Sequence, residues 1–261
     1  MAQWVRFELD GAIQFGTLEP DGETIRVHEG DMFSHPTPTS ASVALTAVRL
    51  LNPTQPRLFI GLWNNFRTLA LKLGQAIPEE PLYFIKAPGC LLEPGGAIRK
   101  PASYAGRVIY EGELGIVIGA RLCDASEEEA AAGIFGYTCV NDVTAIDLLY
   151  SDPSFPQWTR AKSCDSFGPF GPTVATDLDW SALTVRTLVN GRERQNYAAA
   201  DMILTPARIV SLISRELTLA PGDVIACGTS AGALPMRPGT TVTVAIAGIG
   251  TLTNTFAAEQ S

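Results

Sequence analysis

Two glutamates separated by one residue interrupt an otherwise apolar segment of the chain. Glu111 and Glu113 lie within residues 108–118, where most of the other side chains are aliphatic. If the segment is a strand, alternation places both carboxylates on one face, about 6–7 Å apart. Two like charges at a partly buried surface are costly unless a cation lies nearby. A strand face turned to solvent explains the same spacing, because surface carboxylates are common.

A third carboxylate ends a second apolar segment. Residues 135–142 have the pattern of a buried strand that finishes at Asn141 and Asp142. Together with Glu111 and Glu113, Asp142 completes a set of hard oxygen ligands. Such a set suits Mg²⁺ or Mn²⁺ better than zinc and leaves positions for water and substrate oxygens. Asn and Asp also end strands as ordinary turn residues, so this pair is a weak signal by itself.

Two basic residues and a glycine-containing turn are candidate contacts for an anion. Arg160 and Lys162 are two residues apart, which is the spacing of a strand face, and a glycine- and proline-rich segment follows. Lys162 can pair with a substrate carboxylate, and Arg160 can do the same or bridge to Asp165. A solvated surface lysine is the competing interpretation. The turn around Thr229 can direct backbone N–H groups at an anion, or it is only a turn.

Composition limits the class of protein and its partners. The 261 residues are 46% hydrophobic and 18% charged, which is typical of a globular chain with a full core. Nineteen basic against 27 acidic residues give a net charge of −8, which argues against nucleic acid and anionic membrane as partners. No segment approaches the roughly 20 apolar residues of a membrane span and the first residues lack a signal pattern, so we expect a cytoplasmic protein. Two histidines and five scattered cysteines exclude a His-rich metal site and argue against a disulfide framework.

The elements that must position these side chains are mostly strands. Short β-rich segments separated by glycine and proline turns predict an α+β fold dominated by sheet, and not a doubly wound α/β fold. Residues 3–28 have the pattern of a meander with two Asp-Gly turns. A break at 52–56 divides the chain into a small N-terminal β domain, residues 1–55, and a catalytic domain, residues 56–261.

Helical periodicity is limited to a few segments. The pattern predicts helices over 65–73, from 127 to Gly133 or Gly136, and over 205–217. Ser126 and Glu129 form a capping box for the second, and Thr205 is the N-cap of the third. Residues 223–227 and 241–246 are predicted to pair as neighbouring strands.

Taken in order, these motifs resemble the fumarylacetoacetate hydrolase family from about Arg57 to Phe256. The matching segments are 110–114, 136–144, 157–163, 191–196 with Met202, and 219–225 with Gly228 and Thr229. The resemblance implies a mixed β-sandwich roll with a small N-terminal β domain, in a cytoplasmic homodimer.

The resemblance also implies roles for individual residues. Glu111, Glu113 and Asp142 would hold Mg²⁺ or Mn²⁺, and the Thr229 turn and Lys162 would receive a small 2-oxo acid. Glu113 and Lys162 are accordingly the predicted catalytic residues, and the cation would stabilise an enolate of the substrate.

Three further residues are weaker candidates for substrate contact. Gln195 lies in a matching segment, Arg160 precedes Lys162, and Arg67 can bind a distal carboxylate of the substrate.

The segment 65–72 departs from the family pattern. Family hydrolases carry Asn-Tyr-x-x-His-x-x-Glu there, and the His and Glu activate the attacking water; this chain has Leu69 and Lys72 at those positions. General-base catalysis contributes about 10²–10⁴ in rate, so its loss weakens the case for hydrolysis. Decarboxylation, and keto–enol or double-bond isomerisation, need mainly the cation as electron sink.

Two functional hypotheses follow. The first is a Mg²⁺-dependent enzyme that acts on a small 2-oxo acid of the kind formed in aromatic-compound breakdown, by decarboxylation, hydrolysis or isomerisation. The second is a catalytically silent homologue, lacking the His–Glu pair, that binds a metal and a 2-oxo acid without turnover.

Overall fold

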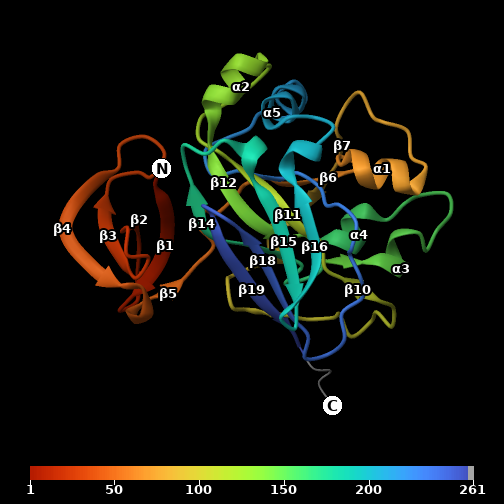
Figure 1. Ribbon diagram of the computed structural model, residues 1–261, viewed down its shortest axis with the longest axis horizontal. Coiled ribbons are helices and arrows are strands. Elements are labelled where there is room, and N and C mark those ends of the chain that lie inside the picture. The colour runs from red at the N-terminus through yellow and green to blue at the C-terminus, as the bar shows by residue number, and fades with distance from the viewer. Residues whose placement is uncertain (258–261) are drawn as a thin grey trace.

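One long mixed sheet runs through the protein and carries most of the site. In the computed structural model, which describes residues 1–257, its strands lie in the order β4-β3-β2-β1-β14-β12-β11-β17-β6-β7 (Figure 1). In chain order they are β1 (Gln3–Leu9), β2 (Ala12–Leu18), β3 (Thr24–Glu29), β4 (Thr37–Ala44), β6 (Phe59–Trp63), β7 (Leu82–Lys86), β11 (Gly112–Ile118), β12 (Ile134–Asn141), β14 (Gly168–Ala175) and β17 (Val224–Ala226). Short strands β5 (Arg49–Leu50) and β8 (Leu91–Leu92) pair with β1 and β14.

A second sheet packs against the middle of the first. Its order is β16 (Arg192–Ala198), β15 (Thr184–Val189), β18 (Thr241–Ile246), β19 (Gly250–Phe256) and β9 (Ala97–Ile98). A separate pair joins β10 (Val108–Ile109) to β13 (Thr144–Ala145). The sheet-dominated α+β fold predicted from the sequence is confirmed.

The helices are short and lie at the edges of the sheets. They are α1 (Arg67–Leu73), α2 (Glu127–Gly133), α3 (Ile146–Leu149), α4 (Trp158–Lys162) and α5 (Pro206–Ser214), with 3₁₀ turns at Leu45–Ala47, Pro88–Cys90, Trp180–Ala182 and Ala199–Asp201. The capping box of α2 and the Thr205 cap of α5 form as predicted. Helix α5 ends at Ser214, earlier than predicted, although the Leu217 N–H still donates to the Ile213 carbonyl. In residues 1–257 no helix has the length and apolar character needed to cross a membrane.

The core between the sheets explains why β11 is apolar. Every residue of β11 is buried. Leu114, Ile116 and Ile118 pack into the cluster that includes Val244 of the second sheet, while Val117 packs into a cluster on the opposite face. The sequence predicted a partly buried strand face beside the glutamates. In the structure both faces of this strand are covered.

The N-terminal meander extends the long sheet at the end away from α1, α3 and α4 (Figure 1). Its strand β1 pairs antiparallel with β14, with Gln3 opposite Ala175. Asp10 and Gly11 both have positive φ, 50° and 78°, as the tight turn between β1 and β2 requires. The meander has its own apolar cluster around Val5 and Phe7. This cluster supports the division after residue 55, which we keep as a proposal.

One predicted strand pairing is wrong. Strand β17 lies between β11 and β6, whereas β18 lies between β15 and β19 in the other sheet. Alternation of apolar residues identifies a strand and its buried face. It does not identify the partner, which depends on how distant segments pack.

Candidate active site

A glycine allows the two glutamates to reach the same side of the sheet. Glu111 lies between β10 and β11, and Glu113 is the second residue of β11. Between them Gly112 faces the second sheet, where a Cβ atom would come within 2.0 Å of the Thr187 hydroxyl oxygen. The Glu111 N–H donates to the Asn141 side-chain oxygen at 3.1 Å. Close packing of the two sheets therefore requires a glycine at position 112, and the glutamates on either side of it direct their charges to the opposite face.

Asp142 completes a compact group of carboxylates at the end of β12. Its N–H donates to the Glu111 carbonyl at 2.8 Å, which joins the ends of the two chain segments. One carboxylate oxygen each from Glu111, Glu113 and Asp142 lies within 4.8 Å of the other two. Glu113 and Asp142 are only 1% and 0% exposed. The three carboxylates form a hard oxygen donor set that fits one Mg²⁺ or Mn²⁺ ion.

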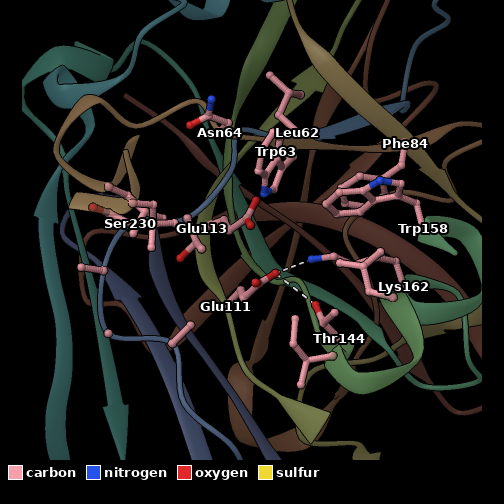
Figure 2. A pocket seen from close by; sticks show the side chains of 18 of the residues that line it. Leu62, Trp63, Asn64, Phe84, Glu111, Glu113, Thr144, Trp158, Lys162 and Ser230 are labelled. Carbon is pink, nitrogen blue, oxygen red and sulfur yellow. Dashed lines mark hydrogen bonds and ion pairs between the residues drawn. The ribbon is translucent and has the colours of Figure 1, made fainter. Parts of the chain in front are cut away.

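Two buried lysines neutralise part of this charge. Lys162, the last residue of α4, forms ion pairs with Asp142 and with Glu111. Figure 2 shows the pair with Glu111. Lys86, at the end of β7, contacts the other Asp142 oxygen at 2.6 Å and donates to the Lys162 carbonyl. Lys86 and Lys162 are 0% and 4% exposed. The cluster therefore carries one excess negative charge when all five groups are ionised, and a divalent cation would reverse its sign.

Burial and neighbouring charges shift the pKa values of the three carboxylates in different directions. Burial, reinforced by the charge of Asp142, raises the pKa of Glu113 well above its ordinary value. Burial also raises the pKa of Glu111, against the effect of Lys162. For Asp142, burial is outweighed by Lys162 and Lys86, which together lower its pKa. The pKa of Lys162 is raised because its three carboxylate neighbours outweigh the effect of burial. Lys162 therefore stays charged, and Glu113 is the carboxylate most able to hold a proton.

This cluster forms the floor of a cavity of about 210 Å³ (Figure 2). The Glu111 carboxylate also accepts a hydrogen bond of 3.1 Å from the Thr144 hydroxyl. Above the floor, the wall is made by Trp63, Phe84 and Trp158, by aliphatic side chains, which are Leu62, Leu69, Leu73, Ile146 and Leu149, and by Asn64 and Tyr150.

The turn at residues 229–233 borders the cavity on another side. Thr229 donates its hydroxyl to the Gly112 carbonyl at 3.0 Å, so the turn is tied to the strand that carries Glu113. Within the described chain, none of the backbone N–H groups of residues 229–233 donates to a protein acceptor. These N–H groups are available to a bound carboxylate or enolate oxygen.

Comparison with known protein families shows to which family the chain belongs. Residues 59–257 match the family described as fumarylacetoacetate (FAA) hydrolase, C-terminal, which is well over half of the chain. The chain belongs to the fumarylacetoacetate hydrolase family. Residues 2–53 match a second family, described as Rv2993c-like, N-terminal.

Several members of the fumarylacetoacetate hydrolase family resemble the chain over most of its length. A solved structure of 2-hydroxyhepta-2,4-diene-1,7-dioate isomerase from Mycobacterium marinum is 37% identical, with a TM-score of 0.90 over 100% of both chains. Oxaloacetate tautomerase YisK of Bacillus subtilis is 35% identical over 77% of this chain and 70% of its own. Fumarylpyruvate hydrolase from Pseudomonas aeruginosa, solved with Mn²⁺ and pyruvate, is 27% identical, with a TM-score of 0.71 over 81% of this chain and 92% of its own.

The departure from the hydrolase pattern of the family lies at the cavity. Leu69, where the sequence resemblance predicts the histidine of the family hydrolases, is on α1 and lines the cavity. Among the described residues that line the cavity there is no histidine; His28 lies in β3 and His35 just before β4. That the apolar wall replaces a general base stays a prediction from the resemblance.

The structure brings some of the weaker candidates to the cavity and leaves others outside. Arg160 is exposed on α4 and does not line it. The predicted strand spacing of Arg160 and Lys162 is wrong, because the segment is helical. Two residues along a helix point about 200° apart, so only Lys162 reaches the cluster. Arg67, the first residue of α1, is exposed, and the same helix directs Leu69 and Leu73 into the cavity.

Gln195 has a supporting position and does not line the cavity. Its side-chain oxygen accepts from the Gly112 N–H at 3.0 Å, and its side-chain nitrogen donates to the Thr229 hydroxyl at 2.8 Å. The amide therefore braces the Thr229 turn against β11. Its hydrogen-bonding atoms are engaged in protein contacts in this structure, and the predicted substrate contact stays a prediction.

Sequence reasoning missed Lys86 and the aromatic wall. Lys86 ends an apolar strand with a charged residue, the same signal that drew attention to Asp142. Trp63 likewise ends β6, and Trp158 begins α4. Nothing in their local spacing indicates that they face one cavity, because they come from three separate parts of the chain.

Proposed function

We propose that the chain is a divalent-cation-dependent enzyme that isomerises or decarboxylates a small 2-oxo acid through its enolate. The observation that carries this proposal is the group of three carboxylates, buried Glu113 and Asp142 and partly buried Glu111, beside the Lys162 ammonium and under a largely apolar wall. When bound, a Mg²⁺ or Mn²⁺ ion supplies Lewis-acid stabilisation of negative charge on the substrate oxygens. The names of the isomerase, tautomerase and hydrolase relatives support the same substrate class.

The chain's own groups divide the remaining work. Lys162 stays protonated and donates a hydrogen bond toward the oxygen on which negative charge develops. Glu113, which lines the cavity at the floor, is the proposed group that takes up and returns a proton on carbon. The N–H groups of the Thr229 turn receive the substrate carboxylate. None of these roles requires an activated water, which is why isomerisation or decarboxylation is preferred to hydrolysis.

A direct test separates enzyme from silent homologue. The protein is incubated with enol-oxaloacetate and with acylpyruvates, with and without Mg²⁺, and absorbance is followed. We expect turnover of at least one of these substrates that requires the cation and is reduced at least about 10²-fold in Glu113→Gln. Tight binding without turnover would favour the silent homologue, and turnover that is indifferent to EDTA would overturn the proposed role of the carboxylates. The homodimer and the cytoplasmic location implied by the resemblance stay predictions.

A further inference from the structure

The floor and the wall of the cavity offer very different partners to a ligand. All of the charged side chains that line it, Glu111, Glu113 and Lys162, belong to the floor. Among the described lining residues Lys162 is the one cation, and it is already paired with Glu111 and Asp142. A ligand that uses the floor for its 2-oxo-carboxylate group therefore finds no second cation for another carboxylate.

The wall is a built aromatic surface. Phe84 lies 5.0 Å from the Lys162 ammonium, so its ring separates the charged floor from what lies above. Trp158 stacks on Phe84 with ring centroids 5.2 Å apart and planes at 11° (Figure 2). Trp63 meets Trp158 at a centroid distance of 6.0 Å. These rings also border a second, shallower hollow of about 560 Å³, which is lined by Pro81, Leu82, Tyr83, Tyr150 and Pro156 in addition.

Basic residues occur on the elements around the cavity but face away from it. Arg67 and Lys72 lie on α1 and Arg160 lies on α4, and all three are exposed and outside the lining. On the same elements the positions that do line the cavity are Leu69, Leu73, Trp158 and Lys162. Apart from Lys162, which belongs to the floor, apolar side chains face inward and cations face outward.

We infer that the substrate is a 2-oxo monocarboxylic acid whose remaining part is an uncharged aliphatic or aromatic group, and that dicarboxylic 2-oxo acids are poor ligands. The inference rests on the proposed function, because it takes the floor as the site of the 2-oxo-carboxylate group. It selects isomerisation, because decarboxylation to an enolate needs a second carboxylate on the carbon next to the oxo group. A second carboxylate placed against the aromatic rings would lose water contacts and gain no cationic partner, which is costly. An alkyl or aryl group there is buried favourably. This would distinguish the chain from relatives named for a dioate, for oxaloacetate and for fumarylpyruvate.

A matched pair of ligands tests the inference by equilibrium binding. Mg²⁺-loaded protein is titrated by calorimetry with 2-oxohexanoate and with 2-oxoadipate, which have the same six carbons and differ only in a terminal methyl or carboxylate. Pyruvate, 2-oxobutanoate and 2-oxopentanoate complete the series. We expect affinity to rise about fourfold with each buried methylene, and 2-oxoadipate to bind at least about tenfold more weakly than 2-oxohexanoate. Equal binding of the pair, or tighter binding of 2-oxoadipate, overturns the inference.

A charge placed on the wall provides the complementary test. Leu73 lines the cavity and is 57% exposed, so Leu73→Arg adds a cation at the wall with little risk to folding. We expect this variant to bind 2-oxoadipate about tenfold more tightly and 2-oxohexanoate more weakly. Leu71→Arg is the matched control, because Leu71 is 69% exposed on the same helix but outside the lining. The same gain in both variants would mean that the effect is not local to the wall, and would overturn the inference.

Oxalate binding separates a failure of this inference from a failure of the proposed function. Oxalate has the two-oxygen head group and no tail. If oxalate binds in a cation-dependent way but tail length has no effect, the floor is correct and the inference about the wall is wrong. If neither oxalate nor any 2-oxo acid binds with the cation present, the proposed function fails and this inference fails with it.

Discussion

The floor and the wall of the cavity differ in charge, in burial and in the elements that hold them. Glu113 and Asp142 are almost fully buried and come from strands whose backbones are hydrogen-bonded to each other. The wall includes Leu73, the last residue of α1, and Tyr150, which follows α3; they are 57% and 61% exposed at the edge of the fold. Removing a paired charge from this floor lowers the free energy of unfolding, because each paired charge compensates another. Exposed residues of the wall can be substituted with little effect on stability. In the proposed function the floor carries out the reaction and the wall selects the substrate.

The largest effect is expected at the floor, on function. Glu113→Gln keeps the size of the side chain and removes a cation ligand and the proposed proton acceptor. We expect cation affinity, measured by calorimetry with Mn²⁺, to fall by about 100-fold or more, with turnover reduced by about 10²–10⁴. Wild-type affinity in this variant would show that Glu113 is not a ligand.

The second effect is on stability and distinguishes two residues of the floor. Asp142→Ala leaves the buried ammonium groups of Lys86 and Lys162 without their shared partner, and we expect a loss of about 3–5 kcal/mol in the free energy of unfolding. Glu113→Gln is the matched control, since it removes a carboxylate that burial and like charge already disfavour. Its cation-free stability should be unchanged or higher. Urea unfolding without added cation measures both, and equal losses would contradict the difference assigned to the two residues.

A smaller effect is expected when the wall is shortened. Trp158→Ala removes the ring that stacks on Phe84 while leaving the carboxylates untouched. We expect binding of 2-oxohexanoate to weaken about tenfold and binding of oxalate to change less than twofold. A comparable loss for both ligands would mean that Trp158 supports the floor rather than the tail of the substrate.

The smallest effect is expected on the outer side of β7, away from the floor. The Tyr83 hydroxyl donates to Glu216 at 2.6 Å, and this bond together with burial raises the pKa of Tyr83 to about 12. Because this pKa is raised, the hydrogen bond contributes its full stabilisation below the ordinary tyrosine pKa near 10. The stabilisation is lost as the pH rises through 12. Tyr83→Phe should therefore cost about 0.5 kcal/mol between pH 7 and 9, a difference that shrinks above pH 10. A pH-independent difference would assign the effect to packing.

Much of the floor could be predicted because its signals are local. An acidic residue inside or at the end of an apolar strand conflicts with its surroundings, and Glu111, Glu113 and Asp142 are all such cases. Lys86 gives the same signal but lacks a neighbouring charge in the sequence to draw attention to it. Arg160 was misjudged for a different reason: over a few residues a strand and a short helix have the same composition, and the two geometries send its side chain to opposite sides.

The wall and the sheet partners could not be predicted because they depend on contacts between distant segments. Trp63, Phe84 and Trp158 meet only when β6, β7 and α4 have packed together. In the same way β17 and β18 were correctly expected to be strands, but their partners were set by which sheet each one joined.

Residue types and their order were sufficient to establish a sheet-rich fold, the three acids and the family, because alternation, turn chemistry and misplaced charges are properties of neighbouring residues. Three-dimensional packing was needed to show that Lys86 and Lys162 share Asp142, that Gln195 braces a turn, and that Arg67, Lys72 and Arg160 face outward. Each of these features depends on contacts between residues that are distant in the sequence. A side chain's direction becomes defined only when the surface opposite it is in place.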